Sequence, residues 1–147
     1  MALDRVADLP TWLLSRANAR SQAILDTAFT AEGVRGYHYR LLAALAQYGS
    51  LSQAGMGRRT GIDRKDVAIA AAELESAELV VRADDPADAR RKVVSLTARG
   101  ETRLRHLDRV LHQVQAEVLA PLTPDEQSAL RSLLAKLIAD DDSGRHA

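Results

Sequence analysis

The sequence has no cysteine and very few aromatic residues. Its 147 residues include one Trp, three Tyr and one Phe, so aromatics make up 3% of the chain. Without cysteine, disulfide bonds, thiolate catalysis and zinc sites built on cysteine are excluded. With so few aromatics, the core must consist mainly of Leu, Val and Ala, a composition that favours helices over a β-sandwich.

Long apolar runs and enzyme motifs are also missing. No stretch approaches the roughly 18 uninterrupted apolar residues of a transmembrane helix. The start, MALDRVADLP, has no basic segment followed by an apolar run, so it is no signal peptide, and we expect a cytoplasmic protein without membrane contact. The chain lacks a nucleophile elbow, a phosphate loop and an H-E-x-x-H motif, so we expect neither an enzyme nor a cofactor.

Charge is balanced overall but unevenly distributed. The net charge is zero, which by itself identifies no partner. Residues 58–65 hold four basic residues and one acid, and residues 90–105 hold six basic residues and one acid. Between them, residues 73–88 hold six acids and one Arg. Such clusters can give a neutral protein one positive face, although charge alone favours the plainer interpretation of three solvated faces.

Hydrophobic spacing predicts three helices in the first part of the chain. The first runs from about residue 9 to 30, where Pro10 suits the first turn and Gly33 follows the end. Its narrow apolar stripe is typical of a helix that packs against a partner chain as well as its own core. Further helices are expected over 37–48 and, capped by Ser52, over 53–59.

A turn, a fourth helix and a hairpin follow. Asp63 supplies the N-cap of a helix over 64–77, in which Val67 and Leu74 lie on the core face and Ile69 on the other. Strands are expected over 79–82 and 92–96. The segment between them, residues 84–91, is predicted to be a loop too long for a tight turn.

Two more helices are predicted near the end of the chain. Thr97 caps a helix running to about residue 120, and its apolar residues recur at the three- and four-residue spacing of a helix that pairs with another helix. Thr123 and Glu126 form a capping box for the last helix, with Pro124 at its first position.

The most specific motifs lie within about fifty residues in the middle of the chain. A helix-turn-helix pattern is formed by Leu51-Ser52-Gln53, Arg59, Gly61-Ile62-Asp63-Arg64, Val67 and Leu74-Glu75. A wing pattern, D-P-x-D-x-R followed by L-T-x-x-G, is formed by Asp85-Pro86-Ala87-Asp88-Ala89-Arg90, Leu96-Thr97 and Gly100. Together these residues resemble the MarR family of bacterial transcriptional repressors.

The resemblance implies a mostly α fold with a small β-hairpin wing. A winged helix-turn-helix DNA-binding domain would occupy residues 35–100. The helices in residues 1–34 and 101–147 would form a dimerisation region. It also implies a homodimeric repressor that binds a palindromic operator in double-stranded DNA. Its two half-sites would lie about one helical turn, or 34–36 Å, apart.

The expected DNA contacts come from both helices of the motif and from the wing. Arg90 suits a narrow, electronegative minor groove, and Arg64 and Lys65 can reach base edges or phosphates. The whole set is Ser52, Gln53, Arg58, Arg59, Arg64, Lys65, Ala68, Ile69, Arg90, Arg91 and Lys92. For Arg58, Arg59, Arg91 and Lys92, a solvated charge is an equally good interpretation.

Two departures from the family pattern affect these expectations. Lys65, Ala68 and Ile69 occupy outward positions that are often Ser, Thr or Arg in the family, which favours apolar contact with thymine methyl groups. Glu78 stands where the family usually has Gly. A left-handed residue there would strain Glu by about 1 kcal/mol or more, and the alternative is a different helix end.

The family also implies a site for a small phenolic or aromatic ligand. Candidates for its lining are Trp12, Arg16, His38 and Tyr39, although Trp12 and Tyr39 fit a packing role at least as well. Asp108 and His112 are four residues apart on one helical face, but no third metal ligand accompanies them, so we expect no metal site. The alternative function is a winged-helix dimer that acts as a protein-interaction adaptor without specific DNA binding.

Overall fold

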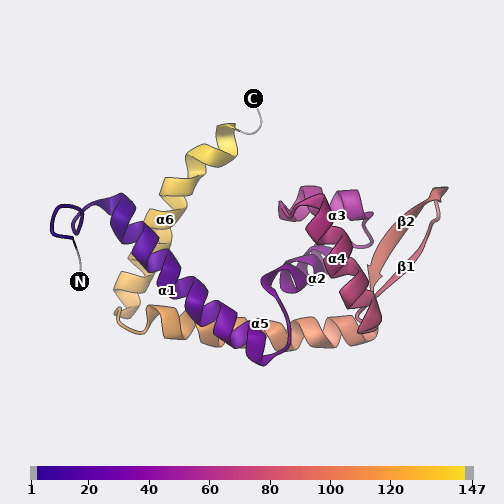
Figure 1. The fold of residues 1–147 in the computed structure, drawn as a ribbon, viewed down its shortest axis with the longest axis horizontal. Helices are drawn as coiled ribbons and strands as arrows, with labels where there is room; N and C mark the ends of the chain where they lie inside the picture. The colour runs from indigo at the N-terminus through magenta and orange to yellow at the C-terminus, as the bar shows by residue number, and fades with distance from the viewer. Residues whose placement is uncertain (1–2, 145–147) are drawn as a thin grey trace.

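The computed structural model describes residues 3–144, which form six helices and one hairpin (Figure 1). The elements, in chain order, are α1 Pro10–Ala31, α2 Gly36–Tyr48, α3 Gln53–Thr60, α4 Arg64–Ser76, β1 Val80–Asp85, β2 Asp88–Leu96, α5 Ala98–Leu119 and α6 Pro124–Gly144. The mostly α fold with a β-hairpin wing is therefore confirmed. The predicted ends of domain segments 1–34 and 101–147 fall partly outside the described residues.

Short polar side chains begin four of the helices, as the sequence predicts. The side-chain oxygens of Ser52, Asp63 and Thr97 accept backbone N–H groups two or three residues ahead, at 2.9–3.2 Å. Thr123 and Glu126 exchange backbone-to-side-chain hydrogen bonds of 2.9 and 3.2 Å. These bonds satisfy N–H groups that have no partner inside the helix, so each helix starts at a defined residue.

The core lies where α2, α4 and α5 meet the root of the hairpin. Helix α4 buries Val67, Ala70, Ala71 and Leu74 and leaves its opposite face exposed, as its spacing predicts. The largest side chains with essentially no exposure are Leu41, Leu42, Met56, Val67, Val94 and Leu107. This packing holds the capped turn between α3 and α4 in one orientation.

The prediction of a long loop at residues 84–91 is wrong. The strands continue to Asp85 and Asp88, and only Pro86 and Ala87 lie between them. Carboxylate side chains shorten the turn, because Asp85 Oδ1 accepts the N–H of Ala87 at 2.9 Å and Asp88 Oδ1 accepts the N–H of Arg90 at 3.1 Å. Polar strands at a hairpin tip carry little of the apolar alternation that identifies a strand from sequence.

Two residues after the last residue of α4, Glu78 adopts the left-handed conformation, with φ = 63°. The N–H of Leu79 donates to the carbonyl of Leu74 at 3.0 Å, and the N–H of Glu78 donates to that of Glu75 at 2.9 Å. This is the pair of bonds that Gly usually supports at a helix end. Glu78 therefore adopts the strained cap, and the helix does not end differently.

A Glu78→Gly substitution should raise the free energy of unfolding by about 1 kcal/mol, because Gly removes the left-handed strain. Urea unfolding at fixed protein concentration measures the change. The matched control is Glu78→Ala, which keeps the strain and equally removes the exposed ion pair with Arg99. A Gly variant no more stable than the Ala variant would contradict the interpretation.

The junction between the hairpin and α5 explains the L-T-x-x-G pattern. Thr97 Oγ1 lies 2.8 Å from the carbonyl oxygen of Glu78 and 3.0 Å from that of Leu79. A Cβ atom on Gly100 would lie only 2.0 Å from the carbonyl oxygen of Leu79. Only glycine permits this approach, which fixes the root of the hairpin on α5.

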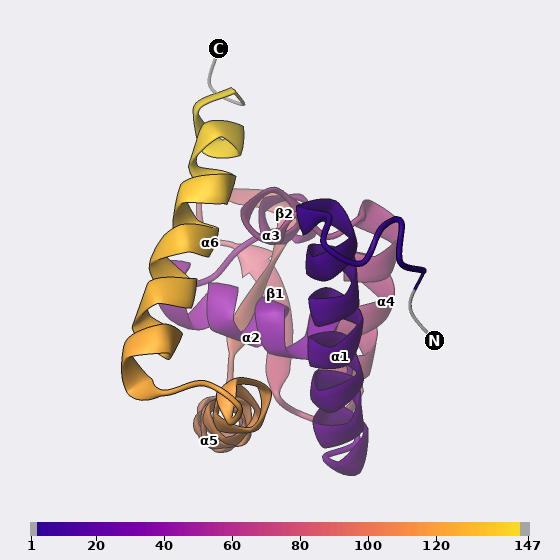
Figure 2. The same ribbon diagram turned by 90° about the vertical axis from the view of Figure 1, so that its left-hand side faces the viewer.

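Helices α1 and α6 extend from α5 as two separate arms (Figures 1 and 2). Helix α1 packs along α5, with Arg20 Nη1 donating to the carbonyl of Val118 at 2.8 Å, whereas no helix of the described chain packs along α6. The large exposed apolar side chains on these arms are Leu13 and Leu14 of α1 and Leu133, Leu134, Leu137 and Ile138 of α6. None of the described helices is long and apolar enough to cross a membrane.

Candidate nucleic-acid interface

The exposed face of α4 starts at a capped N-terminus. Asp63 fixes this end of the helix, and Arg64 and Lys65 are its first two residues, both exposed. One turn further on, Ala68 is exposed and Ile69 retains 46% of its accessible surface. A cationic end followed by a small apolar patch can contact phosphates first and thymine methyl groups beyond them.

Helix α3 places candidate residues at both of its ends. Ser52 and Gln53 are half-buried at its start, and Arg58 and Arg59 are exposed in its last turn. The guanidinium of Arg59 lies 4.3 Å from the ring centroid of Tyr48, a stacking contact that sequence reasoning missed. Tyr48 therefore holds one of the predicted phosphate-binding arginines in place.

Arg90 lies on β2. Among the wing side chains that form ion pairs, it is the most exposed. Its side chain is 92% exposed, and its Nε lies 3.2 Å from Asp88 Oδ1. The same oxygen accepts the Arg90 backbone N–H, so Asp88 orients the arginine without covering it. The predicted local salt bridge is present and leaves the guanidinium open to solvent.

Arg91 and Lys92 make different contacts. Arg91 Nη2 donates to Ser52 Oγ at 3.4 Å and links the wing to the start of α3. Lys92 Nζ lies 2.5 Å from Asp84 Oδ1 on the paired strand. Arg91 is therefore placed between the helical motif and the wing, while the charge of Lys92 is partly compensated within the hairpin.

The acidic side chains of residues 73–88 form ion pairs or hydrogen bonds with other residues of the same subunit. Five of the six face a cation or a histidine, and Asp85 accepts a backbone N–H. The five contacts are Glu73 with His38, Glu75 with Arg82, Glu78 with Arg99, Asp84 with Lys92 and Asp88 with Arg90. Much of the negative charge is thus compensated before any external partner approaches.

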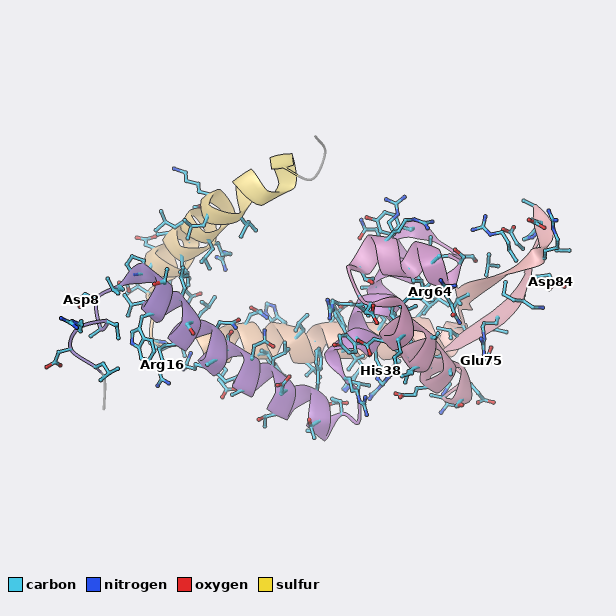
Figure 3. All side chains as sticks on the ribbon, turned by 45° about the horizontal axis from the view of Figure 1, so that its top comes forward. Asp8, Arg16, His38, Arg64, Glu75 and Asp84 are labelled. Carbon is cyan, nitrogen blue, oxygen red and sulfur yellow. The ribbon has the colours of Figure 1, made fainter. Side chains whose placement is uncertain are left out.

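The start of α4 and the tip of the hairpin lie on the same side of the molecule, away from α5 (Figure 1). Figure 3 shows Arg64 on this side and Asp84 near the outer end of the hairpin. The helical candidates and the wing candidates therefore belong to one surface. We call this surface, made by α3, α4 and the hairpin, the basic face.

The four ligand candidates are not brought together within one chain. Figure 3 shows Arg16 on the outer half of α1, far from His38 at the start of α2. His38 Nδ1 accepts the N–H of Arg35 at 3.1 Å, and its Nε2 lies 2.8 Å from Glu73 Oε2. Trp12 is half-buried on the same part of α1 as Arg16. A shared site would therefore need two subunits.

Tyr39 has a structural role in this chain. Its ring stacks on Phe29 with centroids 5.9 Å apart, and its hydroxyl donates to Asp108 Oδ1 at 2.7 Å. Burial, together with this hydrogen bond, raises the pKa of Tyr39 to about 12. Asp108 thus serves Tyr39, and the described residues contain no cluster of three or more potential metal ligands.

Helices α2 to α4 and the hairpin that follows define a winged helix-turn-helix protein. Comparison with known proteins narrows this class, because residues 32–91 match the pattern of the MarR family. A solved structure of a probable transcriptional regulator from Pseudomonas aeruginosa is 31% identical, with a TM-score of 0.77 over 90% of this chain and 99% of that one. The chain belongs to the MarR family, whose members are transcriptional regulators and not enzymes.

Two further relatives indicate the kind of regulation found in similar proteins. The HTH-type transcriptional repressor NicR of Pseudomonas putida is 28% identical over 131 residues, which are 89% of this chain and 83% of NicR. BpsR of Bordetella bronchiseptica, whose DNA binding is regulated by 6-hydroxynicotinic acid, is 26% identical. The superposition of the two structures covers 93% of this chain and 97% of the BpsR chain, with a TM-score of 0.76.

Proposed function

We propose that this chain is a cytoplasmic, homodimeric repressor that binds a palindromic operator and leaves it when a small aromatic ligand binds. Residues 35–100 form the DNA-binding part, and residues 1–34 and 101–147 form the dimerisation part. Each subunit inserts α4 into a major groove and Arg90 into the neighbouring minor groove. Repression follows because the bound dimer covers the promoter.

The observation that carries this proposal is the asymmetry of α4. One face is completely packed into the core, and the other exposes Arg64, Lys65, Ala68 and Ile69 to solvent. Ile69 keeps 46% of its surface exposed one turn beyond two cations, which is unusual for a purely solvated helix face, whereas the major groove offers phosphates and thymine methyl groups to such a surface. The wing arginine on the same side adds a contact of a second kind.

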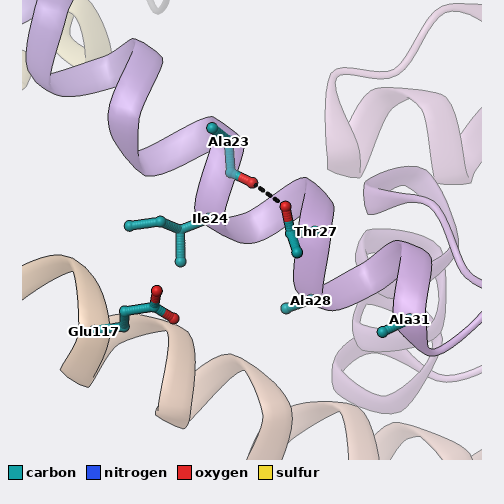
Figure 4. Close-up of a pocket in the computed structure, with 6 residues that line it drawn as sticks. All are labelled: Ala23, Ile24, Thr27, Ala28, Ala31 and Glu117. Carbon is teal, nitrogen blue, oxygen red and sulfur yellow. Dashed lines mark hydrogen bonds between the residues drawn. The ribbon is translucent and has the colours of Figure 1, made fainter.

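The two arms support the homodimer. Helix α6 exposes Leu133, Leu137 and Ile138 at 59–64% of their accessible surface, and a lone helix of this kind is marginal in water. The gap between α1 and α5 forms an apolar groove of about 380 Å³, lined by Ala23, Ile24, Thr27, Ala28, Ala31 and Glu117 (Figure 4). Regulators of the MarR family are dimeric, and a second copy supplies apolar surface to cover these faces.

The ligand is an aromatic acid held where two subunits meet. Arg16 is an exposed cation suited to a carboxylate, and the half-buried Trp12 one turn away offers a ring for stacking. His38 and Tyr39, whose polar atoms already hydrogen-bond within their own subunit, contribute to the wall of the site from the other subunit. The regulation of BpsR by 6-hydroxynicotinic acid supports this ligand class.

Selection of bound sequences from a random DNA pool tests the function. We expect a palindrome that binds at least about 1000-fold more tightly than its scrambled version, with affinity that falls steeply as salt rises. A phenolic acid or 6-hydroxynicotinic acid should weaken this binding. Equal affinity for scrambled DNA would contradict the repressor and favour the protein-interaction adaptor.

A further inference from the structure

Glu75 and Arg82 make the densest polar contact between α4, the proposed recognition helix, and the wing. Glu75 lies in the last turn of α4, and Arg82 is the third residue of β1. Glu75 Oε2 accepts the backbone N–H of Arg82 at 3.1 Å and its Nε at 3.3 Å, while Oε1 accepts Nη2 at 3.1 Å. One carboxylate thus holds both the main chain and the side chain of the strand.

The contact lies where the hairpin leaves the body of the protein, as the position of Glu75 in Figure 3 shows. Arg82 pairs with Val94 on β2, and Val94 exchanges backbone hydrogen bonds of 2.7 and 3.1 Å with Leu51. The hairpin is therefore clamped from both sides at this level. Towards the tip, a long hydrogen bond from Arg91 to Ser52 links the hairpin to the helical part.

Arg90 lies four residues beyond Val94 along β2, which is about 13 Å at the rise of an extended strand. A small rotation of the hairpin at Arg82 therefore produces a displacement of Arg90 that grows with this distance. A minor-groove arginine works only where the narrow groove lies. The contact between Glu75 and Arg82 thus decides whether α4 and Arg90 reach the same DNA duplex.

We infer that Glu75 and Arg82 are positioning residues that lock the wing to the recognition helix, so that the two parts bind the operator as one rigid unit. This inference rests on the proposed DNA-binding function but assigns these residues no contact with DNA. The side-chain hydrogen bond from Arg82 holds the pKa of Glu75 below its ordinary value.

The ion pair between Glu75 and Arg82 affects the position of the wing more than it affects the free energy of unfolding. Both side chains are more than a third exposed, at 38% for Glu75 and 37% for Arg82, and exposed ion pairs add little to the free energy of unfolding. A Glu75→Gln variant should therefore fold normally. Loss of its negative charge should by itself improve attraction to DNA, so a loss of affinity would identify a positioning effect.

The DNA experiment is a double-mutant cycle on the selected operator. Glu75→Gln should weaken binding about tenfold. In the Arg90→Ala background, the same change should weaken binding about twofold or less. The reason is that Glu75→Gln acts by displacing Arg90, and this variant has no Arg90 side chain. Glu78→Gln is the matched control, since it removes the same charge and an ion pair with Arg99 that does not touch the wing. Undiminished affinity of Glu75→Gln, or equal effects in both backgrounds, would overturn the inference.

A second readout needs no DNA and separates this inference from the proposed function. Because the chain has no cysteine, Ala87→Cys in the exposed turn provides a single spin-label site on each wing. Pulsed electron paramagnetic resonance on the dimer should give a narrow distribution of distances between the two spin labels, and Glu75→Gln should broaden this distribution. A distribution that stays narrow would refute the lock even if operator binding is confirmed. Broadening in a protein that binds all DNA equally would support the lock and refute the repressor.

Discussion

A Leu133→Glu, Leu137→Glu double variant should be monomeric at concentrations where the original chain is a dimer. Both leucines lie on one face of α6, exposed at 59% and 64%. Burying one such side chain contributes about 1.5–3 kcal/mol, and a symmetric dimer loses four. The dimer dissociation constant should therefore rise at least about 1000-fold, as measured by sedimentation equilibrium.

Loss of the dimer should also remove operator binding. One subunit can occupy one half-site, and linking two half-site contacts increases affinity by about 100-fold or more. The control is Ser128→Glu with Ser132→Glu, which adds the same charges with the same spacing on the polar face of α6. A double leucine variant that stays dimeric would show that α6 is not part of the interface.

The Arg90→Ala substitution should weaken operator binding by at least roughly 100-fold while leaving the dimer intact. Each hydrogen bond from a charged group contributes about 1.5–3 kcal/mol, and the two wings of a dimer lose one each. The side chain is 92% exposed and supports no core packing, so the effect cannot come from folding.

Fluorescence anisotropy with the selected operator measures this change, and sedimentation checks the dimer. Arg105→Ala on α5 is the control, because it removes the same charge from an exposed helix position outside the basic face. Operator affinity that stays the same in Arg90→Ala, or falls equally in both variants, would refute a minor-groove role for the wing.

The elements that sequence predicted well are those specified by local chemistry. The sequence identifies Ser52, Asp63, Thr97 and Thr123 as caps because a side-chain oxygen next to an apolar repeat satisfies N–H groups within one turn. The buried face of α4 was predictable for a similar reason, since its spacing follows the helical period.

What sequence did not reveal depends on residues that meet only in three dimensions. The hairpin was predicted too short because its outer half is held by charged pairs such as Asp84 with Lys92, which carry no apolar alternation. The lock between Glu75 and Arg82 and the stacking of Arg59 on Tyr48 connect different elements of the fold. The predicted ligand site needs a second subunit, so neither the sequence nor one chain defines its shape.

Hydroxyl-radical footprinting of the dimer on its selected operator tests the central claim most directly. We predict two protected patches related by two-fold symmetry and about 34–36 Å apart, each flanked by minor-groove protection that disappears in Arg90→Ala. Protection spread evenly along the duplex, or limited to a single patch, would contradict an account in which two subunits each place α4 and a wing on the same DNA.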